Sequence, residues 1–563
     1  MKKKSTKERT KPCHKITITS AIPYVNGVKH LGNLVGSLLP ADIFHRFYDL
    51  FEIENIYICG TDEHGTQTEI AAKKEGMTPE EYATKYHQIQ KEIYQKWNFD
   101  FTYFGRTSSK IHTDMTKDFF DAIYKNGYIV ENEITLPYCK NCKMFLADRF
   151  IEGICPDCGF AGARGDQCEN CGKMLDPTDL KESYCVVCGK KDIIFKKEKH
   201  LFLDLSKIEP DLKAWIFRNK HWPVNTRNLA LGWIKDGLKP RCITRNLKWG
   251  VNVPLKGYKD LVFYVWFDAP IGYISFTKEW NPKEYKSWWK GSKIYHFLGK
   301  DNIPFHTIFW PGEIMATRSR KTDFDLPYYV AGYEYLNWEG KKFSTSRGVG
   351  LFSDEALDIF PTDYWRYYLT SILPEKKDSN FDWTDFQNRI NNELIASYGN
   401  LFFRVTSFIE KYFNNVPRPS TPGEQEKNLE KIIKQSIKSV RIYVEKVRIK
   451  EALQEIMILS NELNKYLQVK EPWFAIRTNK KDAATTIYHA LNGLAVVTLM
   501  LWPFIPKTSE IAQEYLGIKG KKWKDIENIS IIEPDKKVRS IILFQKVEDD
   551  AIVAAKRIRH KGE

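Results

Sequence analysis

The sequence lacks any apolar stretch long enough to cross a membrane. Its longest mostly apolar run, Leu494 to Trp502, falls well short of the roughly 20 residues that a transmembrane helix needs, so we expect a buried helix there. Residues 1–12 show no apolar stretch after their lysines, and the sequence therefore predicts no secretory signal. These absences predict a cytoplasmic protein with no membrane partner and without disulfide bonds.

Repeats are also missing, apart from a recurring cysteine pair. At 563 residues and 65.9 kDa the chain is too long for one core and predicts roughly three or four domains. An aromatic content of 14% and an apolar content of 42% exclude wholesale disorder. The net charge of +15 favours a polyanionic partner, either nucleic acid or an anionic membrane. A generally basic proteome would give the same excess.

Strand-like and helix-like patterns alternate in the first part of the chain. A β-branched run at 15–21 precedes a helical pattern at 31–50, and an apolar run at 53–60 precedes a second helical stretch. This order predicts a parallel α/β sheet, in which ligands bind beyond the carboxyl ends of the strands. The segments PYVNGVKHLGN and GTDEHGT lie where strand ends are expected. From about Trp383 to Gly520 strand signals nearly vanish and helical spacing predicts a bundle.

Eight of the eleven cysteines form four Cys-x-x-Cys pairs, Cys139/Cys142, Cys155/Cys158, Cys168/Cys171 and Cys185/Cys188. Two such turns complete a tetrahedral site of four thiolates, so the sequence predicts two structural zinc ions. An iron–sulfur cluster is the alternative. Spacing leaves open which pairs share a metal. It indicates no catalytic role, because four thiolates close the coordination shell.

Two motifs lie about three hundred residues apart, His30-Leu31-Gly32-Asn33 and the run KKFSTSR at 341–347. Each alone is weak, since the first occurs by chance and the second is equally typical of a basic surface loop. Together they resemble the "HIGH" and "KMSKS" signatures of class I aminoacyl-tRNA synthetases. The segments AIPYVNGVKHLGN, GTDEHGT, VWFDAPIGYI, GKDNIPFH and KEPW, with the cysteine-rich insertion, narrow the resemblance to methionyl-tRNA synthetases over roughly residues 15–545.

The resemblance implies a fold and an activity. The expected fold is α/β, with a Rossmann-like parallel-sheet catalytic domain that contains a zinc-binding insertion and is followed by an α-helical bundle anticodon-binding domain. The expected activity is methionine–tRNA ligase. Such an enzyme activates L-methionine with ATP, taken with Mg²⁺, to methionyl-adenylate and pyrophosphate, and then transfers methionine to the 3′ end of tRNA(Met). Positioning and positive charge do most of the work in phosphoryl-type chemistry.

Seven segments follow from this reading. They are a basic N-terminal tail at 1–14, the first half of the catalytic domain at 15–135, the insertion with zinc knuckles at 136–245, the second half of the catalytic domain at 246–325, the KMSKS-like loop and linker at 326–385, the helical anticodon-binding domain at 386–525, and a C-terminal segment with a basic tail at 526–563.

For catalysis the resemblance implies His30, Asn33, Lys342 and Arg347, and for ATP it implies Gly27, His30, Gly32, Asn33, Gly299, Asp301, Lys342 and Thr345. Glycines let a backbone and a helix N-terminus approach a phosphate closely. Two positions depart from the family pattern. Asn33 replaces the second histidine of "HIGH", and Thr345 replaces the second lysine of "KMSKS" and so removes a cation. Lys341, Lys342 and Arg347 are candidates to compensate.

For methionine the resemblance implies Ile22, Tyr24, Asp62, Trp266, Ala269, Pro270, Tyr273 and His306. The Asp62 carboxylate would pair with the substrate ammonium; the alternative is an N-cap of the following helix, a common use of Asp. A thioether packs favourably against aromatic edges. Without the resemblance, Trp266 and Tyr273 would be assigned to the core.

For the anticodon the resemblance implies Asn400, Arg404 and Trp473. Asn400 and Arg404 are four residues apart and share a helix face. An aromatic ring that stacks on an unpaired base, beside groups that bond to its edge, suits single-stranded RNA. For Trp473 alone, a buried aromatic at a helix end is an equal alternative.

Two rival readings stay open at the level of sequence. One is a different class I ligase or adenylate-forming enzyme that uses another amino acid. The other is a zinc-stabilised RNA-binding protein without catalysis, in which Thr345 marks the lost activity. A monomer is expected, since the chain ends soon after LFQKV and leaves no room for the family's optional C-terminal dimerisation domain.

Overall fold

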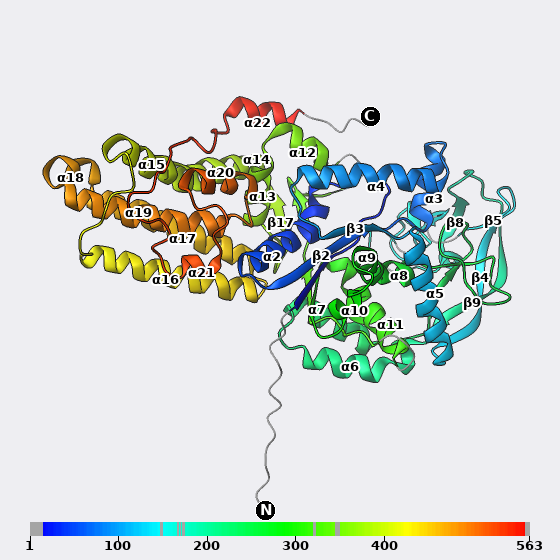
Figure 1. Ribbon diagram of the computed structural model, residues 1–563. Coiled ribbons are helices and arrows are strands. Elements are labelled where there is room, and N and C mark those ends of the chain that lie inside the picture. The colour runs from blue at the N-terminus through cyan, green and yellow to red at the C-terminus, as the bar shows by residue number, and fades with distance from the viewer. Residues whose placement is uncertain are drawn as a thin grey trace, which may run out of the picture.

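The computed structural model describes residues 15–146, 150–165, 168, 170–171, 175–318, 323–343 and 349–557. Figure 1 shows a helical bundle at one end of the molecule, an α/β sheet in the middle and a β-rich insertion at the other end. The predicted N-terminal tail, Thr345, Arg347 and the last residues of the basic C-terminal tail lie outside the described residues.

A five-stranded parallel sheet forms the middle of the molecule. Its order is β14-β13-β1-β2-β3, with β1 at Lys15–Ser20, β2 at Glu54–Thr61, β3 at Tyr103–Arg106, β13 at Lys293–Gly299 and β14 at Tyr329–Tyr333. The predicted parallel α/β sheet is confirmed. Strand β1 lies between β2 and β13, so the strand order runs outward from β1 in both directions and makes it the switch point of the sheet. Ligands of such sheets bind in the crevice beyond the switch point.

Helices cover both faces of this sheet (Figure 1). The helical stretch that follows β1 runs without a break through α1 (Leu31–Asn33), η1 (Leu34–Leu38) and α2 (Leu39–Leu50). The other helices of this region are α3 (Thr66–Lys74), α4 (Pro79–Lys96), α5 (Lys110–Lys125), α8 (Val265–Asp268), η5 (Ala269–Ile271), α9 (Gly272–Trp280), α10 (Tyr285–Trp289), η6 (Lys300–Asn302), η7 (Phe305–Phe309) and α11 (Trp310–Thr317). Helix α4 begins with a capping box made by Thr78 and Glu81, which satisfies its first free N–H groups.

The insertion lies between α5 and α8 and is built on two small antiparallel sheets. The first has the order β10-β9-β4-β5, from Arg241–Cys242, Ile193–Leu203, Ile129–Cys139 and Met144–Phe145; the second has the order β7-β6-β8, from Ala163–Arg164, Ile151–Ile154 and Lys181–Cys185. The long β4–β9 ladder carries the cysteine-rich tip away from the central sheet. After it come η4 (Leu205–Lys207), α6 (Glu209–Arg218), α7 (Val224–Lys235) and the pair β11 (Thr244–Arg245) and β12 (Val262–Phe263), while η3 (Pro177–Asp179) lies near the tip.

The C-terminal half is mostly helical, as predicted. It also contains a small sheet of β15 (Leu336–Trp338), β16 (Lys341–Lys342) and β17 (Ser379–Phe381), of which β17 lies between α13 and α14 in the chain. The helices are α12 (Ser353–Ile359), α13 (Thr362–Ser371), α14 (Trp383–Asn388), η9 (Arg389–Gly399), α15 (Asn400–Tyr412), α16 (Glu424–Glu445), α17 (Ile449–Lys470), α18 (Pro472–Thr478), α19 (Lys480–Leu501), α20 (Pro506–Leu516), α21 (Trp523–Ile526) and α22 (Asp549–Lys556).

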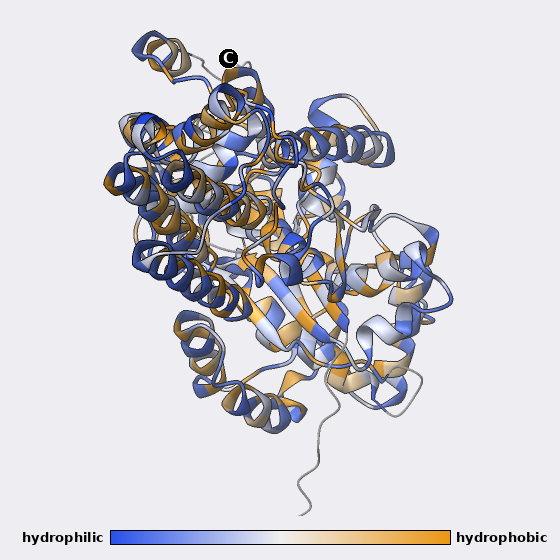
Figure 2. Cartoon of the chain, turned by 60° about the vertical axis from the view of Figure 1, so that its left-hand side comes forward, coloured by the Kyte–Doolittle hydropathy of each residue, from blue (hydrophilic) through white to orange (hydrophobic). Residues whose placement is uncertain are grey.

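Helix α19 forms the centre of the bundle. Figure 2 shows hydrophilic residues on the outward sides of the bundle helices and hydrophobic residues toward the middle. Among the described residues α19 alone is long and apolar enough to cross a membrane, but its apolar window is entirely buried. The predicted buried helix at 494–502 is thus confirmed.

A buried ion pair joins the bundle to the central sheet. Arg366 of α13 is fully buried and donates through Nη2 to Asp42 Oδ2 of α2 at 2.6 Å, and through Nε to the carbonyl of Phe504 at 2.9 Å. Asp42 also accepts from Arg46 Nε at 3.0 Å. Because both charges are desolvated and satisfied by several hydrogen bonds, this cluster fixes the bundle against the helix that follows β1.

Candidate functional site

A cavity of about 1170 Å³ opens beyond the carboxyl ends of the central strands, which is the position predicted from the sheet. Most of the predicted site residues line it: Ile22, Tyr24, His30, Gly32, Asn33, Asp62, Trp266, Ala269, Pro270, Tyr273, Gly299, Asp301, His306 and Lys342. Gly27 is not among the lining residues; its carbonyl accepts a hydrogen bond from Gln90 Nε2 at 3.0 Å.

The two motifs that are distant in sequence meet at this cavity. The N–H of Leu31 donates to the carbonyl of Leu351 at 3.0 Å, and the N–H of Ser353 donates to the carbonyl of Lys29 at 2.8 Å. The imidazole of His30 stacks on the ring of Phe343, with 4.6 Å between the ring centroids and 16° between the planes. The segment with His30 and the segment with Lys342 therefore line the same cavity.

His30 is neutral in this setting. Burial, reinforced by the nearby Lys29 charge, lowers the pKa of His30 to about 4. Its Nδ1 is buried and has no hydrogen-bond partner in the described part of the chain. A neutral imidazole beside a cavity can donate to or accept from a ligand oxygen without bringing a permanent charge.

Asp62 is a buried carboxylate with no ion pair in the part of the chain that the structure describes. Its Oδ1 has no partner among the described residues. Burial, and then the charges of Asp268 and Glu63, raise the pKa of Asp62 well above its usual range, whereas the N–H of His64 and the charge of Lys29 oppose the shift. Helix α3 begins at Thr66 with Gly65 as its N-cap, so the alternative reading of Asp62 as that cap is wrong. A desolvated, unsatisfied carboxylate on a cavity wall suits a cationic ligand.

The walls near Asp62 are aromatic and apolar. Trp266 stacks on Phe305, with 3.8 Å between centroids, and Tyr24 meets Trp266 edge-on at 6.3 Å. The Tyr273 hydroxyl lies 2.8 Å from His306 Nε2, and His306 Nδ1 lies 3.0 Å from the carbonyl of Asn302. Burial lowers the pKa of His306 to about 4, so a neutral ring donates from Nδ1 to that carbonyl and accepts from Tyr273. This end of the cavity suits an apolar side chain.

The other end of the cavity is more open and polar. Lys342 is exposed on β16, and Asn33 and Asp301 are also exposed. A Cβ on Gly299 would lie only 2.9 Å from Asp301 Oδ1, so a larger residue at this strand end would displace the Asp301 carboxylate. Lys300 is already paired, with Glu334 at 2.7 Å and Asp378 at 3.0 Å.

Several lining residues were missed by sequence reasoning. Lys29 adjoins His30 within the motif, and Nζ donates to Asn26 Oδ1 at 2.5 Å; desolvation, opposed by Asp62, lowers the pKa of Lys29 to about 7. Arg245 lines the cavity with its guanidinium 4.0 Å from the centroid of Tyr264. The position of Lys29 beside the motif was a usable signal, but nothing local marked Arg245, which lies at the end of the predicted insertion.

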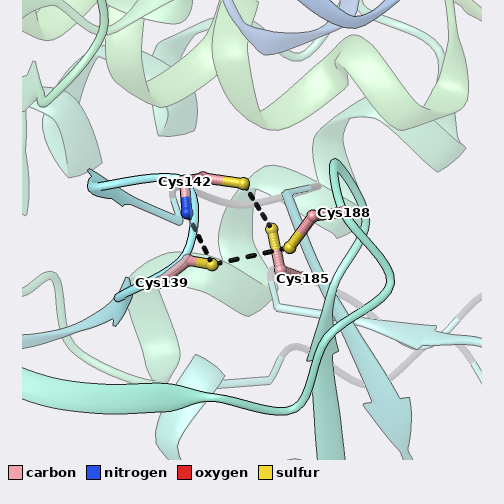
Figure 3. Close-up of side chains that lie close together, drawn as sticks. All are labelled: Cys139, Cys142, Cys185 and Cys188. Carbon is pink, nitrogen blue, oxygen red and sulfur yellow. Dashed lines mark hydrogen bonds between the residues drawn. The ribbon is translucent and has the colours of Figure 1, made fainter.

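The eight paired cysteines form two clusters of four. One comprises Cys139, Cys142, Cys185 and Cys188, and the other Cys155, Cys158, Cys168 and Cys171, so the outer and inner pairs are nested. Sulfur–sulfur distances are 3.7 and 3.9 Å in the first cluster (Figure 3) and 3.9 and 3.6 Å in the second. A tetrahedron with metal–sulfur bonds of about 2.3 Å has edges of about 3.8 Å, so both clusters fit one metal ion each.

Of the three predicted anticodon residues, Asn400 and Arg404 lie one turn apart on α15, and Trp473 lies on α18, which is at the far end of the bundle in Figure 1. Asn400 and Arg404 are exposed on α15, and the Arg404 guanidinium lies 5.2 Å from the ring centroid of Trp473. Trp473 is partly buried at the start of α18 and packs against the core. Its ring is therefore both part of the helix-end packing and accessible.

Comparison with known proteins identifies the family. The family described as "tRNA synthetases class I (M)" matches residues 16–406, and the "Anticodon binding domain of methionyl tRNA ligase" matches residues 416–562. The chain belongs to the class I methionyl-tRNA synthetases. The family suggested by the sequence motifs is thus confirmed, and the predicted order of a catalytic part followed by a helical part agrees with these matches.

Curated methionyl-tRNA synthetases resemble the chain over nearly all of its length. It is 41% identical to the cytoplasmic methionine–tRNA ligase of Xenopus laevis over 555 residues, which cover 96% of this chain and 61% of the relative. It is 39% identical to methionine–tRNA ligase 1 of Acaryochloris marina over 561 residues, which cover 97% of this chain and 99% of the relative. The chain thus spans about three fifths of the vertebrate methionyl-tRNA synthetases that it matches.

A solved methionyl-tRNA synthetase has the same fold. The crystal structure of the Mycobacterium tuberculosis methionyl-tRNA synthetase bound by methionyl-adenylate superposes with a TM-score of 0.79 at 22% identity, covering 94% of this chain and 100% of the other. The predicted combination of a parallel-sheet domain with a helical C-terminal domain is confirmed by this likeness.

Proposed function

We propose that this chain is a methionine–tRNA ligase. The observation that supports the proposal most strongly is the buried carboxylate of Asp62, whose Oδ1 has no hydrogen-bond partner among the described residues. This carboxylate lies on a cavity whose walls also carry an apolar aromatic pocket, His30 and Lys342. An amino acid with an ammonium group and a long apolar side chain satisfies the first two features. A triphosphate satisfies the third.

Methionine would be held by complementary ends of one pocket. Asp62 would pair with its ammonium group, which removes the cost of an unsatisfied buried carboxylate. The thioether would lie against the rings of Tyr24, Trp266 and Tyr273, and sulfur contacts with aromatic edges are favourable. This places the methionine carboxylate toward the end of the cavity that contains His30 and Lys342.

The first step joins methionine to AMP. A methionine carboxylate oxygen attacks the α-phosphorus of ATP, the bond from that phosphorus to the bridging oxygen breaks, and pyrophosphate leaves with the electron pair. His30 would donate a hydrogen bond to a phosphate oxygen as charge shifts, and Lys342 would supply positive charge, both effects of a preorganised site. Mg²⁺ would enter as the ATP complex and offset part of the triphosphate charge.

The second step transfers the methionyl group to RNA. A terminal adenosine hydroxyl of tRNA(Met) attacks the carbonyl carbon of the adenylate, the acyl–phosphate bond breaks and AMP leaves. Trp473 would stack on an anticodon base while Asn400 and Arg404 hydrogen-bond to base edges, as in other recognition of unpaired RNA.

Zinc is the metal that we propose for both cysteine clusters. Four thiolates at tetrahedral separations are the donor set of structural zinc sites, and neither cluster leaves an open coordination position. Each ion would hold the segments at the tip of the insertion together. Metal analysis of the purified chain should give close to two zinc ions, and iron with visible absorbance would instead indicate clusters of iron and sulfur.

The test of the proposed reaction is a panel of amino acids in ATP–pyrophosphate exchange with the purified chain. Exchange that requires methionine is expected, followed by charging of tRNA(Met). Exchange with leucine or valine but not methionine would refute the pocket assignment. Binding of tRNA without any exchange would indicate an RNA-binding protein that lacks catalysis.

We further infer a cytoplasmic protein that acts as a monomer and needs no membrane partner, in line with the sequence-based expectations and with the cytoplasmic ligase among its relatives. Cell fractionation and light scattering during size-exclusion chromatography test these points. A dimer mass or recovery in the membrane fraction would contradict them.

A further inference from the structure

Phe343 packs in a slot directly over the imidazole of His30. The two rings are nearly parallel and 4.6 Å apart. A Cβ on Gly32 would lie 3.1 Å from the Phe343 ring, and a Cβ on Gly350 would lie 2.1 Å from it. Glycines on both sides therefore make room for this ring, and Gly350 also has a φ of +114°, which larger residues rarely adopt.

Phe343 is itself held from behind. The preceding strand β16 pairs with β15, with Trp338 opposite Lys341. The Trp338 ring meets Phe343 edge-on at 5.6 Å and stacks on Phe381 at 4.1 Å. These contacts link Phe343 to the neighbouring aromatic rings and restrict the orientations that its side chain can adopt.

No hydrogen bond holds Nδ1 of His30 among the described residues. Functional histidines commonly have their ring fixed by a hydrogen bond from the second nitrogen. The flat contact with Phe343 covers one face of the imidazole and so restricts the plane of the ring. Offset or parallel aromatic contacts contribute roughly 0.5–1.5 kcal/mol beyond buried area, which is enough to bias a ring between orientations.

We propose that Phe343 is a positioning residue for His30. Phe343 keeps the imidazole in an orientation in which a ring nitrogen faces the polar end of the cavity. Because Lys342 is the preceding residue, the same contact couples the orientation of His30 to the position of Lys342. The inference rests on the proposed adenylate-forming activity, in which His30 contacts ATP. A phenylalanine that merely fills space would leave the orientation of His30 unchanged when replaced by another apolar side chain.

The experiment compares Phe343→Leu, Phe343→Tyr and the matched control Phe195→Leu in the full chain. Phe195 is exposed on β9 of the insertion, so its variant makes the same chemical change away from the cavity. Methionine-dependent exchange by Phe343→Leu should show a kcat reduced about three- to tenfold with an unchanged KM for methionine. Phe343→Tyr, which keeps the ring, should restore kcat to within about twofold of the unmodified chain.

A second readout needs no activity. Diethyl pyrocarbonate modifies neutral imidazoles, and mass spectrometry of the peptide that contains His30 reports the rate at that residue. Phe343→Leu should speed this modification several-fold, whereas Phe343→Tyr and Phe195→Leu should not. Equal kcat in Phe343→Leu and the unmodified chain, equal losses in the Leu and Tyr variants, or an unchanged modification rate would overturn the proposal. Absence of methionine-dependent exchange in the unmodified chain would refute the proposed function alone, because the modification rates still test the contact.

Discussion

The cavity and the patch of Asn400, Arg404 and Trp473, for which we propose anticodon binding, differ in the burial of their polar groups. In the cavity, His30 and Asp62 are desolvated and carry shifted pKa values and unsatisfied atoms. In the patch, Asn400 and Arg404 are exposed on a regular helix. Chemistry on a phosphate needs charges in a medium of low polarity, where each interaction is strong. Reading unpaired bases needs accessible rings and hydrogen-bonding groups.

The difference also has a cost in stability. Buried groups without partners oppose folding until a ligand satisfies them, whereas exposed groups on a helix are nearly neutral. We therefore expect substitutions in the cavity to change activity and stability in opposite directions, and substitutions in the patch to change RNA charging alone. The predictions below test this contrast, beginning with the junction between the two regions.

The largest effect is expected at the buried pair that joins the two regions. Arg366→Met leaves the buried Asp42 with Arg46 and the N–H of Asp100 as its remaining partners among the described residues, and breaking such a buried ion pair costs about 3–5 kcal/mol of unfolding free energy. Denaturant unfolding measures it. The control Arg418→Met removes an exposed pair with Asp535 and should cost at most about 1 kcal/mol. Equal effects of the two variants would show that the junction is not a rigid link.

The next effect is expected at the centre of the cavity. Asp62→Asn removes the charge that would pair with the methionine ammonium, and kcat/KM for methionine should fall about 100-fold or more, which corresponds to roughly 3 kcal/mol. Because the raised pKa of Asp62 reflects an unfavourable buried charge, the neutral amide should increase the melting temperature. Steady-state exchange and calorimetry measure the two quantities. A loss of both activity and stability would mean that Asp62 has a structural partner in the folded protein.

In the patch we expect a smaller effect, which is confined to the charging of tRNA. Trp473→Ala should reduce kcat/KM for tRNA charging about tenfold to 100-fold, since stacking on a base contributes about 1–3 kcal/mol, while pyrophosphate exchange stays unchanged. The control is Phe413→Ala, which removes another partly buried aromatic ring of the same bundle. It should leave kcat/KM for tRNA charging unchanged. Equal losses in exchange and charging would assign Trp473 to packing alone.

The smallest effect concerns a buried acid behind the cavity. Both carboxyl oxygens of Glu313 lack partners among the described residues, and burial followed by the charge of Asp268 raises the pKa of Glu313 well above its usual range. A raised carboxyl pKa stabilises the fold at low pH, and this contribution is lost as pH rises above the unfolded value of about 4.3. Relative to the unmodified chain, Glu313→Gln should therefore gain at least about 1 kcal/mol between about pH 5 and about pH 7. A difference between the two proteins that is independent of pH would contradict the assignment.

Local patterns predicted much of the architecture. Alternating strand and helix signals marked β1, α2 and β2, and the apolar spacing after Trp383 marked the bundle. The predicted end of the second catalytic half at residue 325 does not coincide with the end of the central sheet. Strand β14 at Tyr329–Tyr333 follows that residue and forms an edge strand of the sheet. A short strand has no period long enough to fix its partner, so its place in a sheet depends on the rest of the fold.

The sequence motifs predicted most of the residues that line the cavity, but they did not predict the burial or the hydrogen bonding of those residues. Asp62 was predicted to bind a cation or to cap a helix, and only its burial and the cap at Gly65 decide against the second use. Lys29 was not predicted although it adjoins His30 in the sequence. Arg245 was not predicted because only its proximity to residues far along the chain makes it part of the cavity.

The sequence by itself determined the composition of this protein's parts: four pairs of thiolates, a parallel sheet, a helical bundle and two motifs typical of class I synthetases. These are properties of neighbouring residues, which side-chain periodicity and turn chemistry reveal directly. Within the described residues, the tertiary structure alone decided which cysteines share a cluster, that Asp62 Oδ1 has no hydrogen-bond partner, and that Phe343 lies on His30. Pairing, desolvation and stacking depend on distances between segments that are separated in the sequence, by tens of residues for the cysteines and by hundreds for His30 and Phe343, and only the folded chain sets those distances.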